Sequence, residues 1–91
     1  MKINEIVATV LENTMTKGGG KFTQVMLAAE LTEKYGKKVS PAAVNDRLRN
    51  ENMKVNTALE MLDILGYDIV VVPREKGREK YEVERGSLRE R

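Results

Sequence analysis

The sequence predicts one mainly α-helical domain, built from about four helices and completed by a C-terminal β-strand or hairpin. Its 91 residues allow a single modest core, because a chain of this size removes only about 60 to 65% of its extended surface from water. Apolar residues recur at helical spacing as far as Gly66, with capping residues, glycines and a proline between the helical stretches. After Gly66 the pattern changes to the two-residue period of strands. A multidomain enzyme is therefore not expected.

The first helix is predicted over residues 3–14. Its apolar or semi-apolar positions recur every three or four residues and are Ile3, Ile6, Val7, Val10, Leu11 and Thr14. The opposite face carries Asn4, Glu5, Thr9, Glu12 and Asn13. Three glycines at 18–20 then end the pattern, since they cost too much backbone entropy for a helix. A phosphate-binding loop here would need glycine in place of Met15 and Ser or Thr in place of Phe22, so we interpret the segment as a loose connector.

The second helix is predicted over residues 24–35, with Thr23 as its N-cap and Gly36 as its C-terminal stop. One face of this helix is apolar and consists of Leu27, Ala28, Leu31 and Tyr35. A third helix starts at Ser40 and Pro41, an N-cap followed by proline at the first helical position, where its missing N–H costs nothing. The two helices are therefore separated by a short turn.

The third helix is expected to end near Asn50 or Asn52. A fourth is predicted to begin at Thr57, which forms a capping box with Glu60, and to end at Gly66. Its apolar residues surround the whole helix, as expected inside a core, and are Ala58, Leu59, Met61, Leu62, Ile64 and Leu65.

The C-terminal part of the chain has strand character. Residues 69–72 are all β-branched and are followed by Pro73, which predicts a short strand. Further on, Tyr81, Val83 and Arg85 alternate with Glu82 and Glu84. We predict a hairpin with residues 74–78 as its loop, and a disordered charged tail is the alternative. The predicted organisation is a helical domain over 1–67, a hairpin over 68–85 that belongs to it, and a flexible tail over 86–91.

The composition excludes several kinds of chemistry. The chain has no cysteine, histidine or tryptophan, which excludes disulfides, thiolate or imidazole catalysis and Cys/His zinc sites. We expect no cofactor and no enzyme activity, since acidic pairs such as Glu82 and Glu84 fall on a predicted solvated strand face. The polar N-terminus lacks the apolar stretch of a signal peptide, and the longest apolar run is too short for a membrane span. A cytoplasmic location is the expectation.

The third predicted helix has few apolar residues and presents a distinctive surface. Val44 and Leu48 point inward, one turn apart. The outward face carries Ala42, Asp46 and Arg49, flanked by Ala43, Asn45 and Asn50. These short or planar groups suit base edges in a major groove: Asn pairs with adenine, Arg with guanine, Asp with cytosine, and Ala methyls meet thymine methyls. The pattern predicts a DNA-recognition helix, with an ordinary solvated face as the alternative.

Positive charge is concentrated around this helix. The whole chain has 16 basic and 14 acidic residues and a net charge of +2. Residues 34–54 contain six basic and two acidic residues, so this segment carries +4 and the remainder −2. Lys37 and Lys38 in the turn, together with Arg47 and Lys54, are placed to contact phosphates without reading sequence. A solvated basic patch is the alternative for the lysines.

Three motifs occur in order along the middle of the chain. They are Thr23-Gln24-x-x-Leu27-Ala28-x-x-Leu31, Val39-Ser40-x-x-Ala43-Val44, and Leu62-Asp63-Ile64-Leu65-Gly66-Tyr67. Together they resemble the Cro/lambda-repressor (XRE) type of helix-turn-helix protein, and the small prophage-type regulators in particular. Those regulators combine an Asn-Met element, here Asn52-Met53, with a terminal Leu-Gly-Tyr and a β-strand. The resemblance implies a lambda-repressor-like helix-turn-helix bundle that binds double-stranded DNA.

The resemblance also implies roles for individual residues. Gln24, at the start of the first motif helix, is expected to touch a phosphate. Base readers are expected at Ser40, Ala42, Asn45 and Asp46, with Arg49 further along. Arg47 occupies a position that is often apolar in the family, and Leu48 takes the inward role. Residues 32–38 intervene where the family turns directly, so we expect a second helix longer by about one turn and a larger turn after it.

The leading hypothesis is a sequence-specific transcriptional regulator, a repressor, acting as a homodimer on a pseudo-palindromic operator. One small recognition helix gives limited specificity, whereas two copies about 34 to 36 Å apart give more. The apolar strand at 68–73 is the candidate dimer surface because its edge can pair across a two-fold axis. The alternative is an antitoxin or phage accessory protein whose main activity is binding a protein partner through the hairpin and charged tail.

Overall fold

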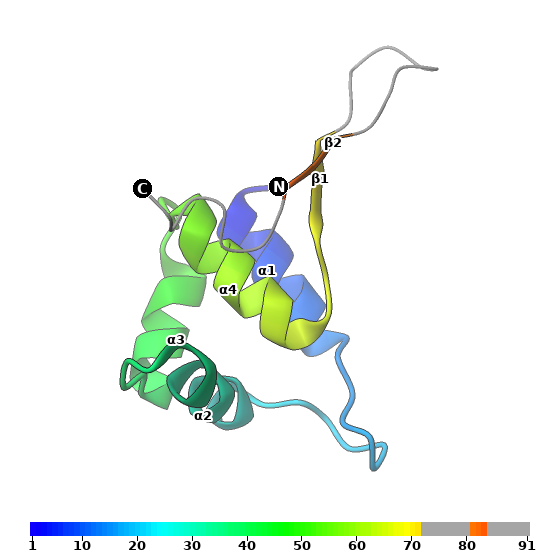
Figure 1. Ribbon diagram of the computed structural model, residues 1–91, viewed down its shortest axis with the longest axis vertical. Coiled ribbons are helices and arrows are strands. Elements are labelled where there is room, and N and C mark those ends of the chain that lie inside the picture. The colour runs from blue at the N-terminus through cyan, green and yellow to red at the C-terminus, as the bar shows by residue number, and fades with distance from the viewer. Residues whose placement is uncertain (72–80, 84–91) are drawn as a thin grey trace.

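The computed structural model of the protein describes residues 1–71 and 81–83. These residues form four helices and two strands: α1 (Ile3–Glu12), α2 (Gln24–Tyr35), α3 (Pro41–Arg49), α4 (Val55–Leu65), β1 (Ile69–Val71) and β2 (Tyr81–Val83) (Figure 1). The predicted mainly α fold with a C-terminal hairpin is thereby confirmed. The predicted hairpin loop at 74–78 and tail at 86–91 lie outside the described residues.

Each of the four described helices contributes at least one fully buried side chain to a common core. Val7 of α1, Leu27 of α2, Val44 of α3 and Met61 of α4 all have no solvent exposure. The helices α1 and α4 pack together, and α2 and α3 lie along one side of this pair (Figure 1). None of the described helices, the longest of which has 12 residues, is long and apolar enough to cross a membrane. The core thus fixes α3 from behind and leaves its other side open.

The start of α4 differs from the prediction. The helix begins at Val55 with Lys54 as its N-cap residue, so the predicted start and capping box at Thr57 are wrong. Met53 is buried and only 7% exposed. Because this side chain anchors the chain to the core just before the helix, the helix can begin two residues earlier than the sequence pattern indicates.

The connector between α1 and α2 is an ordered arm, so its prediction as a loose segment is wrong. We define the arm as residues 14–22. Met15 pairs with Lys21 in an antiparallel bridge, the Phe22 N–H donates to the Thr14 carbonyl at 3.1 Å, and the Thr16 N–H donates to the Gly20 carbonyl at 2.7 Å. The arm projects from the helices in Figure 1 (blue to cyan). The helix α1 before it ends at Glu12, two residues earlier than predicted.

The hairpin is antiparallel and begins directly after α4. Ile69 pairs with Val83, Val70 with Glu82 and Val71 with Tyr81. Ile69 packs against the helical core, whereas Val70 and Val71 are 45% and 51% exposed. Beyond its first residue, β1 therefore extends away from the helices, as Figure 1 shows.

Candidate nucleic-acid interface

The helix α3 is held by its two ends and by a narrow apolar stripe. The Ser40 hydroxyl accepts a hydrogen bond from the Ala43 N–H at 3.1 Å, and Pro41 occupies the first turn. Only Val44 and Leu48 are buried within the helix. The predicted N-cap and inward residues are thus confirmed, and the rest of the helix surface remains open for contacts with a partner.

The outward face of α3 has the predicted arrangement. Ala42, Asp46 and Arg49 are exposed. The flanking residues Ala43, Asn45 and Arg47 are half-buried. Asn50 is the C-cap residue, and its side-chain oxygen accepts a hydrogen bond from the Asn52 N–H at 2.9 Å. This bond commits Asn50 to the turn after α3, so it is a less suitable base reader than its neighbours.

The turn between α2 and α3 is fastened by a residue that the sequence patterns did not single out. The Thr32 hydroxyl accepts a hydrogen bond from the Val39 N–H at 2.9 Å, and it lies within 3.2 Å of the Val39 carbonyl and 2.9 Å of the Ala28 carbonyl. Gly36 starts the turn with a φ of 73°. A hydroxyl one turn before a C-terminal glycine is the signal that could have indicated this role. The turn therefore holds Lys37 and Lys38, both exposed, in a defined place.

The C-terminal end of α3 is held by Asn4 of α1. Asn4 is only 5% exposed, although the sequence pattern predicted that it would lie on the polar face of the first helix. Its side-chain Nδ2 donates a hydrogen bond to the Leu48 carbonyl at 2.9 Å, which satisfies one of the carbonyls that a helix end leaves unpaired. Asn4 therefore connects the first helix to the candidate recognition helix, and no local pattern shows this.

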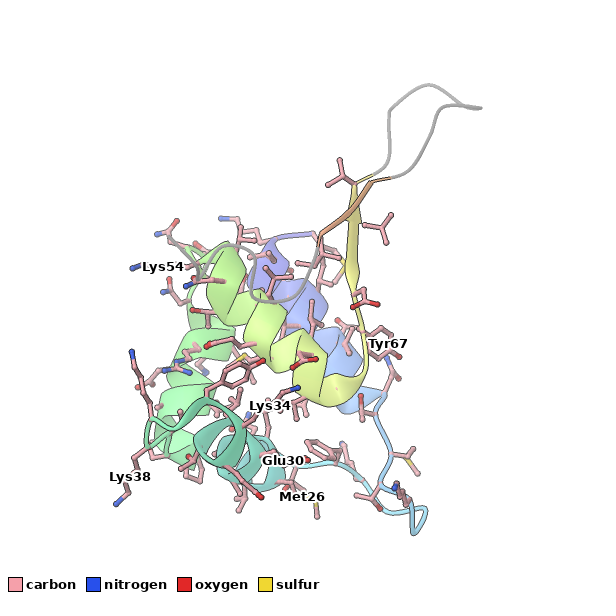
Figure 2. The ribbon with its side chains drawn as sticks, viewed as in Figure 1. Met26, Glu30, Lys34, Lys38, Lys54 and Tyr67 are labelled. Carbon is pink, nitrogen blue, oxygen red and sulfur yellow. The ribbon has the colours of Figure 1, made fainter. Side chains whose placement is uncertain are left out.

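Basic side chains gather at both ends of α3. A hollow of about 280 Å³ follows its C-terminus and is lined by Arg47, Asn50, Asn52, Met53, Lys54 and Thr57. A second hollow of about 150 Å³ includes Lys37, Arg47 and Glu60, so Arg47 lies between the two. Figure 2 shows Lys38 and Lys54 projecting at the same edge of the molecule, beside opposite ends of α3. The structure thus places the basic residues predicted to contact phosphates around the two ends of α3.

Lys34 does not belong to this basic surface. Its ammonium group pairs with the carboxylate of Asp63, which also accepts a hydrogen bond from the Tyr35 hydroxyl at 2.8 Å. The Lys34 side chain points from α2 toward α4 in Figure 2. Its charge contributes to the +4 of residues 34–54, but it stabilises the packing of α2 on α4.

Three of the four described helices have no acidic residue in the first turn. This holds for α2, α3 and α4, whereas α1 has Glu5 there. A helix N-terminus carries a partial positive charge that acidic side chains normally compensate. Gln24 is the first residue of α2 and half-buried, and Lys54 directly precedes α4, which has no side-chain N-cap bond. These uncompensated ends favour anions such as phosphates.

Comparison with protein-family models, with curated proteins and with solved structures finds no match for this chain. The resemblance to the Cro/lambda-repressor type stays a prediction from the sequence motifs. The placement of the predicted site residues is nevertheless defined. Gln24 begins α2, Lys37 and Lys38 lie in the turn, and Ser40 caps α3; Ala42, Ala43, Asn45, Asp46, Arg47 and Arg49 lie on α3, and Lys54 precedes α4.

Proposed function

We propose that the protein is a sequence-specific DNA-binding regulator of transcription, with α2 and α3 as its helix-turn-helix and α3 as its recognition helix. The outward face of α3 carries this proposal. The helix buries two side chains and exposes Ala42, Asp46 and Arg49, which are short or planar groups that match the edges of base pairs. Repression by occupying an operator is the simplest activity of such a domain.

The surroundings of α3 support the proposal because they suit the DNA backbone. Most hydrogen bonds between proteins and DNA go to phosphate and sugar, and they position the reading element. Lys37 and Lys38 stand at one end of α3, and Arg47 and Lys54 at the other. A duplex with α3 in its major groove would meet positive charge on both sides of the helix.

We further propose that two copies bind together through the side of the molecule formed by α1 and β1. An apolar hollow of about 250 Å³ lies there, lined by Ile3, Ile6, Val10, Leu62, Tyr67, Asp68 and Ile69. Val70 and Val71 of the adjoining strand are exposed. No residue of α2 or α3 lines this hollow, so a second copy that covers it would leave both recognition helices free.

The test is a selection of binding sites from random duplexes. The wild-type protein should select a two-fold symmetric motif, and its binding constant should fall as salt increases. The variants Asn45→Ala and Arg49→Ala should each relax the preference at one position per half-site, with losses of about 1 to 3 kcal/mol. Asn13→Ala, which removes an exposed amide from the end of α1, is the matched control. Unchanged motifs in the α3 variants would refute the assignment of the recognition face.

A second candidate function is binding of a protein partner through the hairpin, as an antitoxin or phage accessory protein would do. The exposed Val70 and Val71 favour it, since an apolar strand can be completed by a strand from a partner. Deletion of residues 76–91 removes β2. In a DNA-binding regulator, the truncated chain should still bind a duplex with a single half-site at low salt. If the full-length chain instead formed a protein complex that the folded truncated chain could not form, the second candidate would be favoured.

A further inference from the structure

The arm between α1 and α2 has a charge that the candidate interface does not use. Lys17 lies in its turn and Lys21 at its base, and both are exposed. No acidic residue occurs between Glu12 and Glu30, so neither charge is compensated by a near neighbour in the sequence. The arm is therefore a positive projection on a chain whose net charge is only +2.

Hydrogen bonds hold the arm in one shape and fasten it to the core. The Gly19 N–H donates to the Thr16 carbonyl at 3.0 Å, and the Gly20 N–H donates to the Thr16 hydroxyl at 3.1 Å. At its base, the Thr14 hydroxyl donates to the Val10 carbonyl at 2.7 Å, and Phe22 packs against the core. The two lysines are thus presented from a fixed position.

Only one of the three glycines is required by the shape of the arm. Gly19 has a φ of 86°, which L side chains rarely adopt. Gly18 has no such φ, and a Cβ built on it would meet only the Thr16 hydroxyl oxygen, at 3.9 Å. Among the described residues, the N–H groups of Lys17 and Gly18 have no acceptor. The turn therefore leaves bare N–H donors beside an ammonium group, and another molecule can approach this backbone closely.

The arm lies at the opposite end of α2 from the turn that carries Lys37 and Lys38. In Figure 1 the two segments flank α2 along the lower part of the molecule. Lys21 precedes Gln24 by three residues, and Gln24 begins the acid-free first turn of α2. A polyanion lying along α2 would thus meet positive groups at both ends of the helix.

We propose that this arm is a second contact with the DNA backbone, in which Lys17 and Lys21 bind phosphates at the flank of the half-site read by α3. The inference rests on the proposed DNA-binding function and adds to it a surface outside the helix-turn-helix. Contacts of this kind add affinity without sequence information, because every nucleotide carries the same phosphate.

The test compares the double variant Lys17→Gln, Lys21→Gln with the wild-type protein on a duplex obtained from the binding-site selection. Loss of two phosphate contacts should lower the slope of log binding constant against log salt by about 1.8. Between 50 and 200 mM salt, the binding constant of the wild-type protein should therefore fall by a factor about 12 times larger than that of the double variant. The selected motif should stay the same. Lys2→Gln, which removes an exposed lysine paired with Glu51 at 3.4 Å, is the control and should leave the slope unchanged.

A second pair of variants tests the same surface without removing a lysine. Gly18→Asp and Gly18→Asn have side chains of the same shape at an open position, and they differ in charge. The aspartate variant should bind the duplex several-fold more weakly than the asparagine variant at low salt, and the two should melt at similar temperatures. Equal binding by this pair, together with a wild-type slope for the lysine variant, would overturn the arm proposal. If Arg49→Ala still altered the motif, the proposed function would stand. If the wild-type protein bound no duplex, both would fall.

Discussion

Replacing Asn4 by alanine tests how the domain holds its candidate recognition helix. The side chain reaches from α1 to the Leu48 carbonyl at the end of α3, over a separation of 44 residues in the sequence. It is 5% exposed, so water cannot readily replace the lost donor. We expect Asn4→Ala to destabilise the whole domain and to loosen α3 in particular.

The magnitude follows from two opposing effects. Loss of a buried hydrogen bond costs about 0.5 to 1.5 kcal/mol, and a buried acceptor left without a partner costs about 1 to 3 kcal/mol. In the other direction, the variant removes the Asn4 Oδ1 atom, which is buried and has no hydrogen-bond partner within the described part of the chain. We therefore expect a net loss of about 2 kcal/mol in the free energy of unfolding, which lowers Tm by roughly 8 to 16 °C.

Urea denaturation of three proteins measures this effect: the wild type, Asn4→Ala and Asn13→Ala. Asn13 is the matched control because it also lies at an end of α1 and also donates from Nδ2 to a backbone carbonyl, that of Thr9, at 3.0 Å. Its bond is exposed, so its loss should cost less than about 0.5 kcal/mol. Equal midpoints for the two variants would refute the structural role of Asn4. A third variant, Asn4→Asp, keeps the shape but sets a carboxylate against a carbonyl, and it should cost at least about 3 kcal/mol.

Three further predictions concern the turn, the dimer surface and the first turn of α3. Thr32→Val should lower the free energy of unfolding by about 1 to 2 kcal/mol, because a turn N–H loses its acceptor. The control Thr9→Val, which removes an exposed hydroxyl bonded within α1, should change it little. Equal melting temperatures of the two variants in calorimetry would contradict the role of Thr32 in the turn. Val70→Glu should shift the protein toward a monomer in sedimentation experiments. The control Val25→Glu, at a position 62% exposed on α2, should not. Identical sedimentation of the two variants would contradict the proposed dimer surface. Ala42→Glu should raise the stability of α3 by about 0.3 to 1 kcal/mol and yet weaken duplex binding, and a gain in both would count against the recognition face.

The helix ends and the outward face of α3 follow from local sequence patterns. Ser40 forms the predicted N-cap bond, and Gly36 and Gly66 end their helices with φ of 73° and 86°. Periodicity also identifies Val44 and Leu48 as the buried residues of α3. In all these cases the physical cause lies within a few residues of the effect, since capping, left-handed glycines and amphipathic faces are properties of single elements.

The remaining features arise where distant segments meet, and local patterns therefore miss them. Asn4 looks like a solvated residue until α3 is placed against it, and its partner Leu48 is 44 residues away. Lys34 looks like part of a basic surface until α4 brings Asp63 beside it. The arm is closed by the bridge between Met15 and Lys21, and Phe22 at its end packs against the core, whereas three adjacent glycines alone indicate a loose segment.

The helix N-termini link stability to the proposed function. An acidic residue in the first turn of a helix stabilises it by about 0.3 to 1 kcal/mol, and α1 has this feature in Glu5, whose carboxylate accepts a hydrogen bond from the Lys2 N–H at 3.0 Å. The other three helices lack it. A chain with 14 acidic residues has no shortage of them. Lys21 lies three residues before α2, Lys37 and Lys38 lie just before α3, and Lys54 directly precedes α4, so a polyanion bound by these lysines would supply at the three helix N-termini the negative charge that the chain itself does not.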